Sequence, residues 1–195
     1  NWEGLSAVEF FLEMNANPGK WKTVPLVKVG NPELKRILGI SNDFVSFDQM
    51  FDQSGSYRLN ELVQQSYNKK QTLRNKFDKE IINVDERINI CYQIFNGEFL
   101  KIFPVPNDDR KTWITQSTVP ETMKKEEADF VRGILNLYYS EVLNSQETGN
   151  WSKSDEYLGH IKKYQKTYGA DIIPSSTKIS LEVFYNEWNI FGKLA

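Results

Sequence analysis

The chain has 195 residues, of which 39% are hydrophobic, 13% aromatic and 26% charged, and this composition excludes a disordered polypeptide and suits one folded domain. A net charge of −2 and an isoelectric point near 5.6 remove the bulk electrostatic basis for binding nucleic acid, which normally needs an excess of lysine and arginine. The single cysteine, Cys91, excludes an internal disulfide and a multi-cysteine zinc site. No run of about 18 apolar residues predicts a membrane span. Because the sequence begins at Asn1 instead of methionine, we expect it to be a piece of a longer protein.

The first third of the chain is predicted to hold short helices and one extended segment. Ser6 and Glu9 have the spacing of a capping box, which predicts that a helix begins there. Residues 17–19, Asn-Pro-Gly, are expected to break the chain, and the β-branched run at 25–29 is expected to be extended. Residues 31–39 carry a cap, a proline at the first helical position and a terminal glycine, and so predict another short helix.

The stretch from Thr72 to Gly97 is the longest segment whose residues agree on a single structure, and it predicts a long helix. A shorter helix is predicted before it, over 59–67. Apolar side chains recur there at steps of three and four, and they are Leu73, Phe77, Ile81, Val84, Ile88, Cys91 or Tyr92, and Phe95. Thr72 is the expected cap and Gly97 the expected stop. Charged side chains between the apolar positions are expected to face water, and they are Lys76, Lys79, Asp85, Glu86 and Arg87.

After Gly97, a β hairpin is predicted from the strand-like run 99–103 and the segment 113–115. Helical periodicity then returns over 121–144, where Gly133 costs about 1 kcal/mol relative to alanine and suggests close approach of a neighbouring element. Residues 146–150 are expected to form a polar loop. A further helix is predicted to begin at Ser152 or Ser154 and to end at Gly169, with an inner face formed by Tyr157, Leu158, Ile161, Tyr164 and Tyr168.

From Thr177 a last amphipathic helix is predicted, whose apolar stripe contains Leu181, Phe184, Trp188 and Phe191. We expect this stripe to pack against its own domain, and the alternative is an interfacial helix that leads toward a membrane. Together these elements predict a mainly α fold: a single-domain bundle of about six to eight helices over residues 1–195, with a small β hairpin or short extended segments.

Few residues suggest chemistry. Cys91 lies on an apolar stripe without a cationic neighbour to lower its pKa, so we interpret it as a core residue and not as a nucleophile. The only histidine, His160, cannot form a metal site alone and is expected to be structural or solvated, with haem ligation or proton transfer as the alternative. Adjacent acidic pairs such as Asp85 and Glu86 point in different directions on a helix and do not indicate a glycosidase. The sequence contains no nucleophile elbow, phosphate-binding loop or C-x-x-C-H haem attachment motif.

Three long stretches carry a resemblance to a known family: GLSAVEFFLEMNANPGKWKTVPLVKVGNPELKRILGI, KFDKEIINVDERINICYQIFNGEFLKIFPVP and IKKYQKTYGADIIPSSTKISLEVFYNEWNIFGKL. Together they are similar to the soluble extracytoplasmic domain of fused ResB/CcsA-type cytochrome c synthetases, the system II machinery of cytochrome c biogenesis. The resemblance covers nearly the whole chain.

The resemblance implies a parent protein that moves haem across the inner membrane and joins it to the cysteines of C-x-x-C-H in apocytochrome c, as a cytochrome c haem lyase. The family's tryptophan-rich segment and haem-ligand histidines match no position here, so no catalytic residue and no metal site are assigned, and no cofactor is expected in this domain, although haem is implied for the parent. His160 is retained only as a possible haem contact.

We therefore expect an accessory periplasmic domain of a membrane-anchored synthetase, on the outer side of the inner membrane. Its expected partners are apocytochrome c and the membrane domains of the parent, with no nucleic acid. The alternative is a non-catalytic scaffold or sensor domain that binds a protein or a small ligand through an exposed aromatic patch near Trp21, Trp113 or Trp151.

Overall fold

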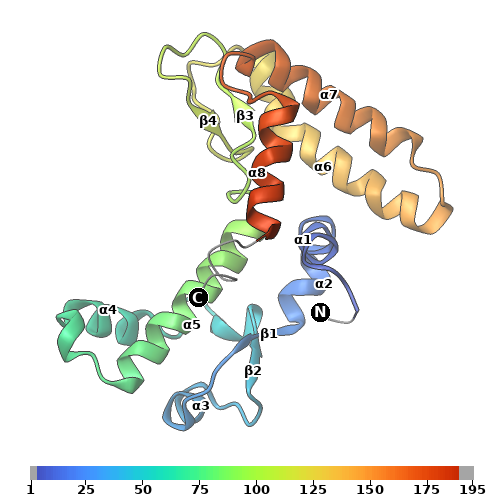
Figure 1. The fold of residues 1–195 in the computed structure, drawn as a ribbon. Coiled ribbons are helices and arrows are strands. Elements are labelled where there is room, and N and C mark those ends of the chain that lie inside the picture. Colours follow the sequence, from blue (N-terminus) through green and yellow to red (C-terminus); the bar gives the residue numbers. More distant parts are fainter. Residues whose placement is uncertain (1–3, 189–195) are drawn as a thin grey trace.

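The computed structural model describes residues 4–188, and over this range the chain forms a single, mainly helical domain (Figure 1). The predicted fold class is confirmed. The α-helices of the described range are α1 (Ala7–Ala16), α2 (Pro18–Thr23), α3 (Pro32–Leu38), α4 (Asn60–Asn68), α5 (Lys76–Phe95), α6 (Lys125–Thr148), α7 (Ser152–Gly169) and α8 (Ser176–Trp188). Two short 3-10 helices, η1 (Asp48–Met50) and η2 (Gln71–Leu73), precede α4 and α5.

Two small antiparallel sheets accompany the helices. One pairs β1 (Pro25–Lys28) with β2 (Phe44–Ser46), and the other pairs β3 (Phe103–Pro104) with β4 (Trp113–Ile114). The predicted hairpin is therefore present, although its strands have only two residues each, and Phe99 is exposed before the first of them. Pro104 lacks an N–H for a longer ladder, which keeps this sheet small.

Local signals placed the first helices correctly. The capping box of α1 is formed by Ser6 and Glu9, and Asn31 caps α3, which ends at Gly39 in the left-handed conformation. The expected break at residues 17–19 is confined to Asn17, because α1 ends at Ala16 and α2 begins at Pro18. The Asn17 side chain accepts a hydrogen bond from the backbone N–H of Lys20, and proline suits the first helical position.

The helix α5 begins later than predicted. Its cap is Asn75 and not Thr72, because Asn75 and Asp78 form a capping box in which each side chain accepts a hydrogen bond from the other residue's backbone N–H. Leu73 lies before the helix, and its exposed fraction is 70%, so it is not part of the apolar stripe. Gly97 ends the segment with a φ of 66°, as predicted.

Two clusters of buried side chains form the core. The first lies between α5, the small β1–β2 sheet and the helices α1 to α4, and contains Trp21, Leu34, Met50, Ile81 and Val84. The second lies between α6, α7 and the β3–β4 hairpin, and contains Phe103, Val131, Leu135, Ile161 and Tyr164. The helix α1 packs against both α5 and α6 and so lies between the clusters (Figure 1).

The helices α6 and α7 depart from prediction at their ends and at one glycine. The helix α6 begins at Lys125 and not at 121, and it continues to Thr148, so most of the expected loop at 146–150 is helical. A Cβ atom at Gly133 would have nothing within 4 Å beyond the helix itself, so the expected close approach there is wrong. Trp151 occupies the cap position of α7, and Ser154 is buried within the first turn.

A close approach is found instead at Gly169, the last residue of α7. A Cβ atom there would lie 2.8 Å from Cζ2 of Trp113 and 3.2 Å from Cγ of Pro104. The same face of α7 is joined to the hairpin by hydrogen bonds from the Tyr164 hydroxyl to the Pro104 carbonyl (3.3 Å) and from Gln165 to the Ile102 carbonyl (3.0 Å). Glycine at 169 therefore allows the hairpin to pack directly against the helix.

The final helix, α8, does not pack as expected. Leu181 and Phe184, two members of its predicted inner face, are 62% and 52% exposed. Ile179 and Val183, which lie on the other side of the helix, are also exposed. The side chain of Trp188 and the residue Phe191, the other members of the predicted stripe, fall outside the described residues.

Candidate functional site

Cys91 is a core residue, as predicted. It is 8% exposed and belongs to the first buried cluster, where burial raises the pKa of its thiol to about 11. It also lines a mostly apolar cavity of about 270 Å³ with Phe10, Met14 and Ile94. Arg87 borders this cavity, but its guanidinium donates a hydrogen bond to the Lys28 carbonyl at 2.8 Å. The site therefore disfavours a thiolate.

His160 lies on the exposed surface of α7. Its side chain is 51% exposed, and Nε2 lies 3.5 Å from a carboxylate oxygen of Glu156, one turn earlier in the helix. Among the described residues, no group of three or more histidine, cysteine, aspartate or glutamate side chains has a metal-binding arrangement.

The three tryptophans proposed for an aromatic patch are in different environments. Trp21 is completely buried, and its ring packs edge-on against Phe10 with centroids 5.0 Å apart. Trp113 is partly covered and lies against Gly169. Trp151 is 46% exposed, at the α6–α7 turn. The expectation of a patch at Trp21 is therefore wrong.

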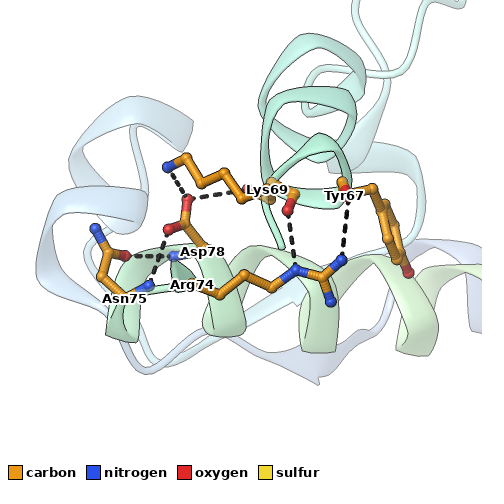
Figure 2. Close-up of polar contacts among 6 residues, drawn as sticks. Tyr67, Lys69, Arg74, Asn75 and Asp78 are labelled. Carbon is orange, nitrogen blue, oxygen red and sulfur yellow. Dashed lines mark hydrogen bonds and ion pairs between the residues drawn. The ribbon is translucent and has the colours of Figure 1, made fainter. Parts of the chain in front are cut away.

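An extended polar network joins α4 to α5 (Figure 2). The guanidinium of Arg74 donates to the carbonyl oxygens of Ser66 (3.0 Å) and Tyr67 (3.1 Å), which are left without helical partners at the end of α4. On the other side, Asp78 accepts hydrogen bonds from Lys69 and from the backbone of Asn75. The hydrogen bond from Lys69 is the main reason that the pKa of Asp78 is lowered. Arg74, Asn75 and Asp78 satisfy backbone groups at helix ends, and Lys69 pairs with Asp78, so this network is structural.

Two cavities adjoin the β3–β4 hairpin, with volumes of about 550 and 430 Å³. Asp108 borders both, but its carboxylate accepts hydrogen bonds from the backbone of Arg110 and Thr112 and thereby shapes the loop. Glu127, in the larger cavity, accepts a hydrogen bond from the Tyr168 hydroxyl at 3.1 Å. Asp108 and Glu127 therefore already accept hydrogen bonds from groups within the domain.

A smaller cavity on α5 has a different character. It has a volume of about 210 Å³ and is lined by Phe51, Tyr57, Asp85, Ile88, Asn89 and Tyr92. Asp85 was expected to face water, but it is only 8% exposed. Burial is the largest influence on its carboxyl group and raises its pKa. The hydroxyl oxygen of Tyr57 is also buried, and its polar neighbour is the carboxylate of Asp85.

Sequence reasoning missed this cavity, although part of it was visible in the helical spacing. Asp85, Ile88, Asn89 and Tyr92 stand at i, i+3, i+4 and i+7, which places them along one face of α5. The missing information was the position of Phe51 and Tyr57. They lie 25 and 19 residues before the start of α5, and no local pattern predicts that their loop packs against this helix.

The chain is similar to Protein NrfI of Wolinella succinogenes, to which it is 30% identical over 192 residues. The matched region covers 98% of this chain and 21% of NrfI, so the chain spans about a fifth of the length of this relative. No protein-family model matches the sequence.

Proposed function

We propose that this chain is an accessory extracytoplasmic domain of a membrane-anchored cytochrome c biogenesis protein, in which it supports apocytochrome docking and haem attachment by the membrane part of the parent. The observation that carries the proposal is similarity along nearly the whole chain. Three long stretches resemble the soluble domain of ResB/CcsA-type synthetases, and the match to Protein NrfI supports a role in cytochrome c maturation. Haem would belong to the parent and would not be held by this domain.

The surface of α8 supports contact with the rest of the parent protein. Leu181 is 62% exposed on one side of the helix, and Ile179 and Val183 are 44% and 50% exposed on the opposite side. Apolar side chains on opposite sides of a helix are typical of a helix that is covered on more than one side. The membrane domains of the parent, on the periplasmic side of the inner membrane, are the proposed cover. Among the described residues, no helix has the length and hydropathy needed to cross a membrane.

Two measurements test this function. In cells, the segment of the parent that corresponds to residues 4–188 of this chain would be replaced by a flexible linker. The amount of haem-stained cytochrome c would be compared with that in cells carrying the intact parent, and we expect strongly reduced maturation. In solution, calorimetry would compare an apocytochrome peptide containing C-x-x-C-H with the same peptide in which both cysteines are serine. Normal maturation after the deletion, together with no difference between the peptides, would refute the proposal.

The cavity on α5 favours a second candidate, a ligand-binding or scaffold domain. A buried carboxylate and a buried hydroxyl beside aromatic rings are features of a recognition site. If maturation is normal without the domain but ligand binding to this cavity is retained, the second function would replace the first.

A further inference from the structure

We propose that the Asp85 cavity is a binding site for an alkylammonium or guanidinium group, the chemistry of a small amine or of a lysine or arginine side chain. The cavity is formed by α5 on one side and by the aromatic residues Phe51 and Tyr57 on the other. This inference does not depend on the function proposed above.

The first argument is the charge of Asp85. Its carboxylate lies in a nearly buried position, and no described lysine, arginine or histidine forms an ion pair with it. Its carboxylate accepts a hydrogen bond from the side-chain amide of Asn89 at 3.2 Å, and its other polar neighbour is the hydroxyl of Tyr57. A buried carboxylate without a cation is costly, and a cationic ligand would supply the missing opposite charge.

The hydroxyl of Tyr57 is the second argument. Burial, and after it the neighbouring Asp85 carboxylate, raise the pKa of Tyr57, so the hydroxyl and the carboxylate lie side by side in the cavity. The hydroxyl oxygen can accept a hydrogen bond from an incoming N–H while the carboxylate accepts another. A guanidinium or ammonium group carries enough donors to satisfy both oxygens at once.

Aromatic rings complete the site. The rings of Phe51 and Tyr57 lie 5.6 Å apart with an angle of 44° between their planes, and Tyr92 borders the same cavity with 46% of its side chain exposed. A cation close to such rings is stabilised by their π electrons, by roughly 0.5–2 kcal/mol. Aliphatic carbons next to the cation would contact Ile88, the remaining apolar wall.

The aromatic wall is held in place before any ligand arrives. Phe51 and Tyr57 are joined by an antiparallel β-bridge, and the loop between them is closed by hydrogen bonds from the backbone of Ser54 and Ser56 to the carboxylate of Asp52. Gly55 takes the left-handed conformation that this turn requires, with a φ of 80°. A preformed wall reduces the ordering that binding would otherwise cost.

The volume decides which part of a ligand can enter. About 210 Å³ accommodates the end of a lysine or arginine side chain, or a small alkylamine, but not a folded segment. The site can therefore bind the cationic group alone, either as part of a small amine or at the end of a side chain of another protein.

Calorimetry with ethylguanidinium and butylammonium ions tests the shared chemistry, with butanol as the uncharged control. We expect saturable binding of at least one cation and none of butanol. Asp85→Asn, which keeps the shape of the side chain, should weaken binding at least tenfold. The matched control is Glu86→Gln, which removes the same charge from the neighbouring exposed position and should change affinity less than threefold.

A second variant tests the contribution of the aromatic rings, and a second ligand tests the source of the cation. Tyr92→Leu removes a ring at the exposed edge of the cavity and should weaken binding several-fold while circular dichroism stays unchanged. A capped peptide with one central arginine, compared with the same peptide containing citrulline, separates the two sources of the cation. Tenfold tighter binding of the arginine peptide than of ethylguanidinium indicates a protein partner, whereas equal affinity indicates a small amine.

The proposal is overturned if neither cation nor the arginine peptide binds to the folded protein. It is also overturned if Glu86→Gln weakens binding as much as Asp85→Asn, because general negative charge would then explain the attraction. Neither result bears on cytochrome c maturation in cells, so failure here is distinguishable from failure of the proposed function.

Discussion

The ammonium group of Lys69 lies 2.5 Å from a carboxylate oxygen of Asp78, so the residue that follows α4 is tied to the first turn of α5. The Asp78 side chain is 4% exposed, whereas that of Lys69 is 45% exposed. Because the lysine hydrogen bond, followed by that of the Asn75 backbone, lowers the pKa of Asp78, the folded protein favours the charged carboxylate. This contribution to stability is present above the pKa of an ordinary aspartate and is lost as the pH falls through the lower folded value.

Asp78→Asn should therefore lower the melting temperature at pH 7, because the ion pair and one hydrogen bond of the capping box are lost. The difference from the unaltered protein should shrink as the pH falls below 3.8, the ordinary value for this group. Thermal denaturation at several pH values measures both effects. Asp129→Asn, which removes an exposed ion pair on α6, is the control and should change little. A pH-independent loss for Asp78→Asn would contradict the prediction.

Asp85→Asn should have the opposite effect on stability. Burial raises the pKa of Asp85, so the stability associated with this group is present at low pH and is lost as the pH rises through the raised folded value. Asparagine is neutral at every pH, so the variant does not lose this stability. Its free energy of unfolding should exceed that of the unaltered protein at pH 7, and the difference should decrease toward pH 3. Chemical denaturation at pH 7 and pH 3 tests the sign. Destabilisation at pH 7 would show that the carboxylate is better satisfied than its contacts indicate.

Gly169→Ala should destabilise the protein by about 1–3 kcal/mol, because the added methyl group would press against Trp113 and Pro104. Gly133→Ala is the matched control, since its methyl group meets nothing within 4 Å and alanine favours the helix. We expect Gly133→Ala to stabilise the protein by about 0.5–1 kcal/mol. Urea denaturation of both variants measures the contrast. Equal effects of the two substitutions would mean that the hairpin can move away from α7.

Cys91 should react slowly with iodoacetamide. A rise in its pKa from 9.0 to about 11 reduces the thiolate fraction at pH 8 by about 100-fold, and burial further limits access. Mass spectrometry over time should show labelling much slower than that of a cysteine peptide, and the difference should disappear in 6 M guanidinium, a concentration of the order that unfolds most domains. Rapid labelling of the folded protein would contradict the assignment of Cys91 to the core.

His160→Ala should leave both stability and haem spectra unchanged. The imidazole lies mostly in solvent, and its described polar neighbour is Glu156, a contact typical of an exposed helix pair. Titration of haem into the two proteins, monitored at the Soret band, tests the remaining possibility of haem ligation. A Soret shift seen only with the histidine present would assign a haem contact to this domain.

The elements that sequence reasoning placed correctly depend on residues within one helical turn. The capping box at Ser6, the cap at Asn31 and the left-handed stop at Gly97 are examples, because each forms its hydrogen bonds or its turn locally. The wrong predictions concern which face of a helix is buried and which segments pack against it. Trp21 is fully buried and Leu73 is exposed because distant segments, and not their own helical spacing, decide what covers them.

The candidate site was less predictable for the same reason. The helical face from Asp85 to Tyr92 could be read from the spacing of α5, but a charged side chain on such a helix normally faces water. Its burial arises from the loop that carries Phe51 and Tyr57, which approaches α5 only in the folded chain. The burial of a carboxylate by residues distant in the sequence therefore cannot be predicted from local sequence patterns.

The position of α1 determines how the domain unfolds. Its Met14 belongs to the cluster around α5, while Leu12 and Ala16 pack against the cluster around α6. Loss of either cluster would therefore expose one face of this ten-residue helix, which is too short to persist in water alone. The released helix would in turn uncover the second cluster. The two cores are for this reason coupled in unfolding and should melt in a single cooperative transition instead of one after the other.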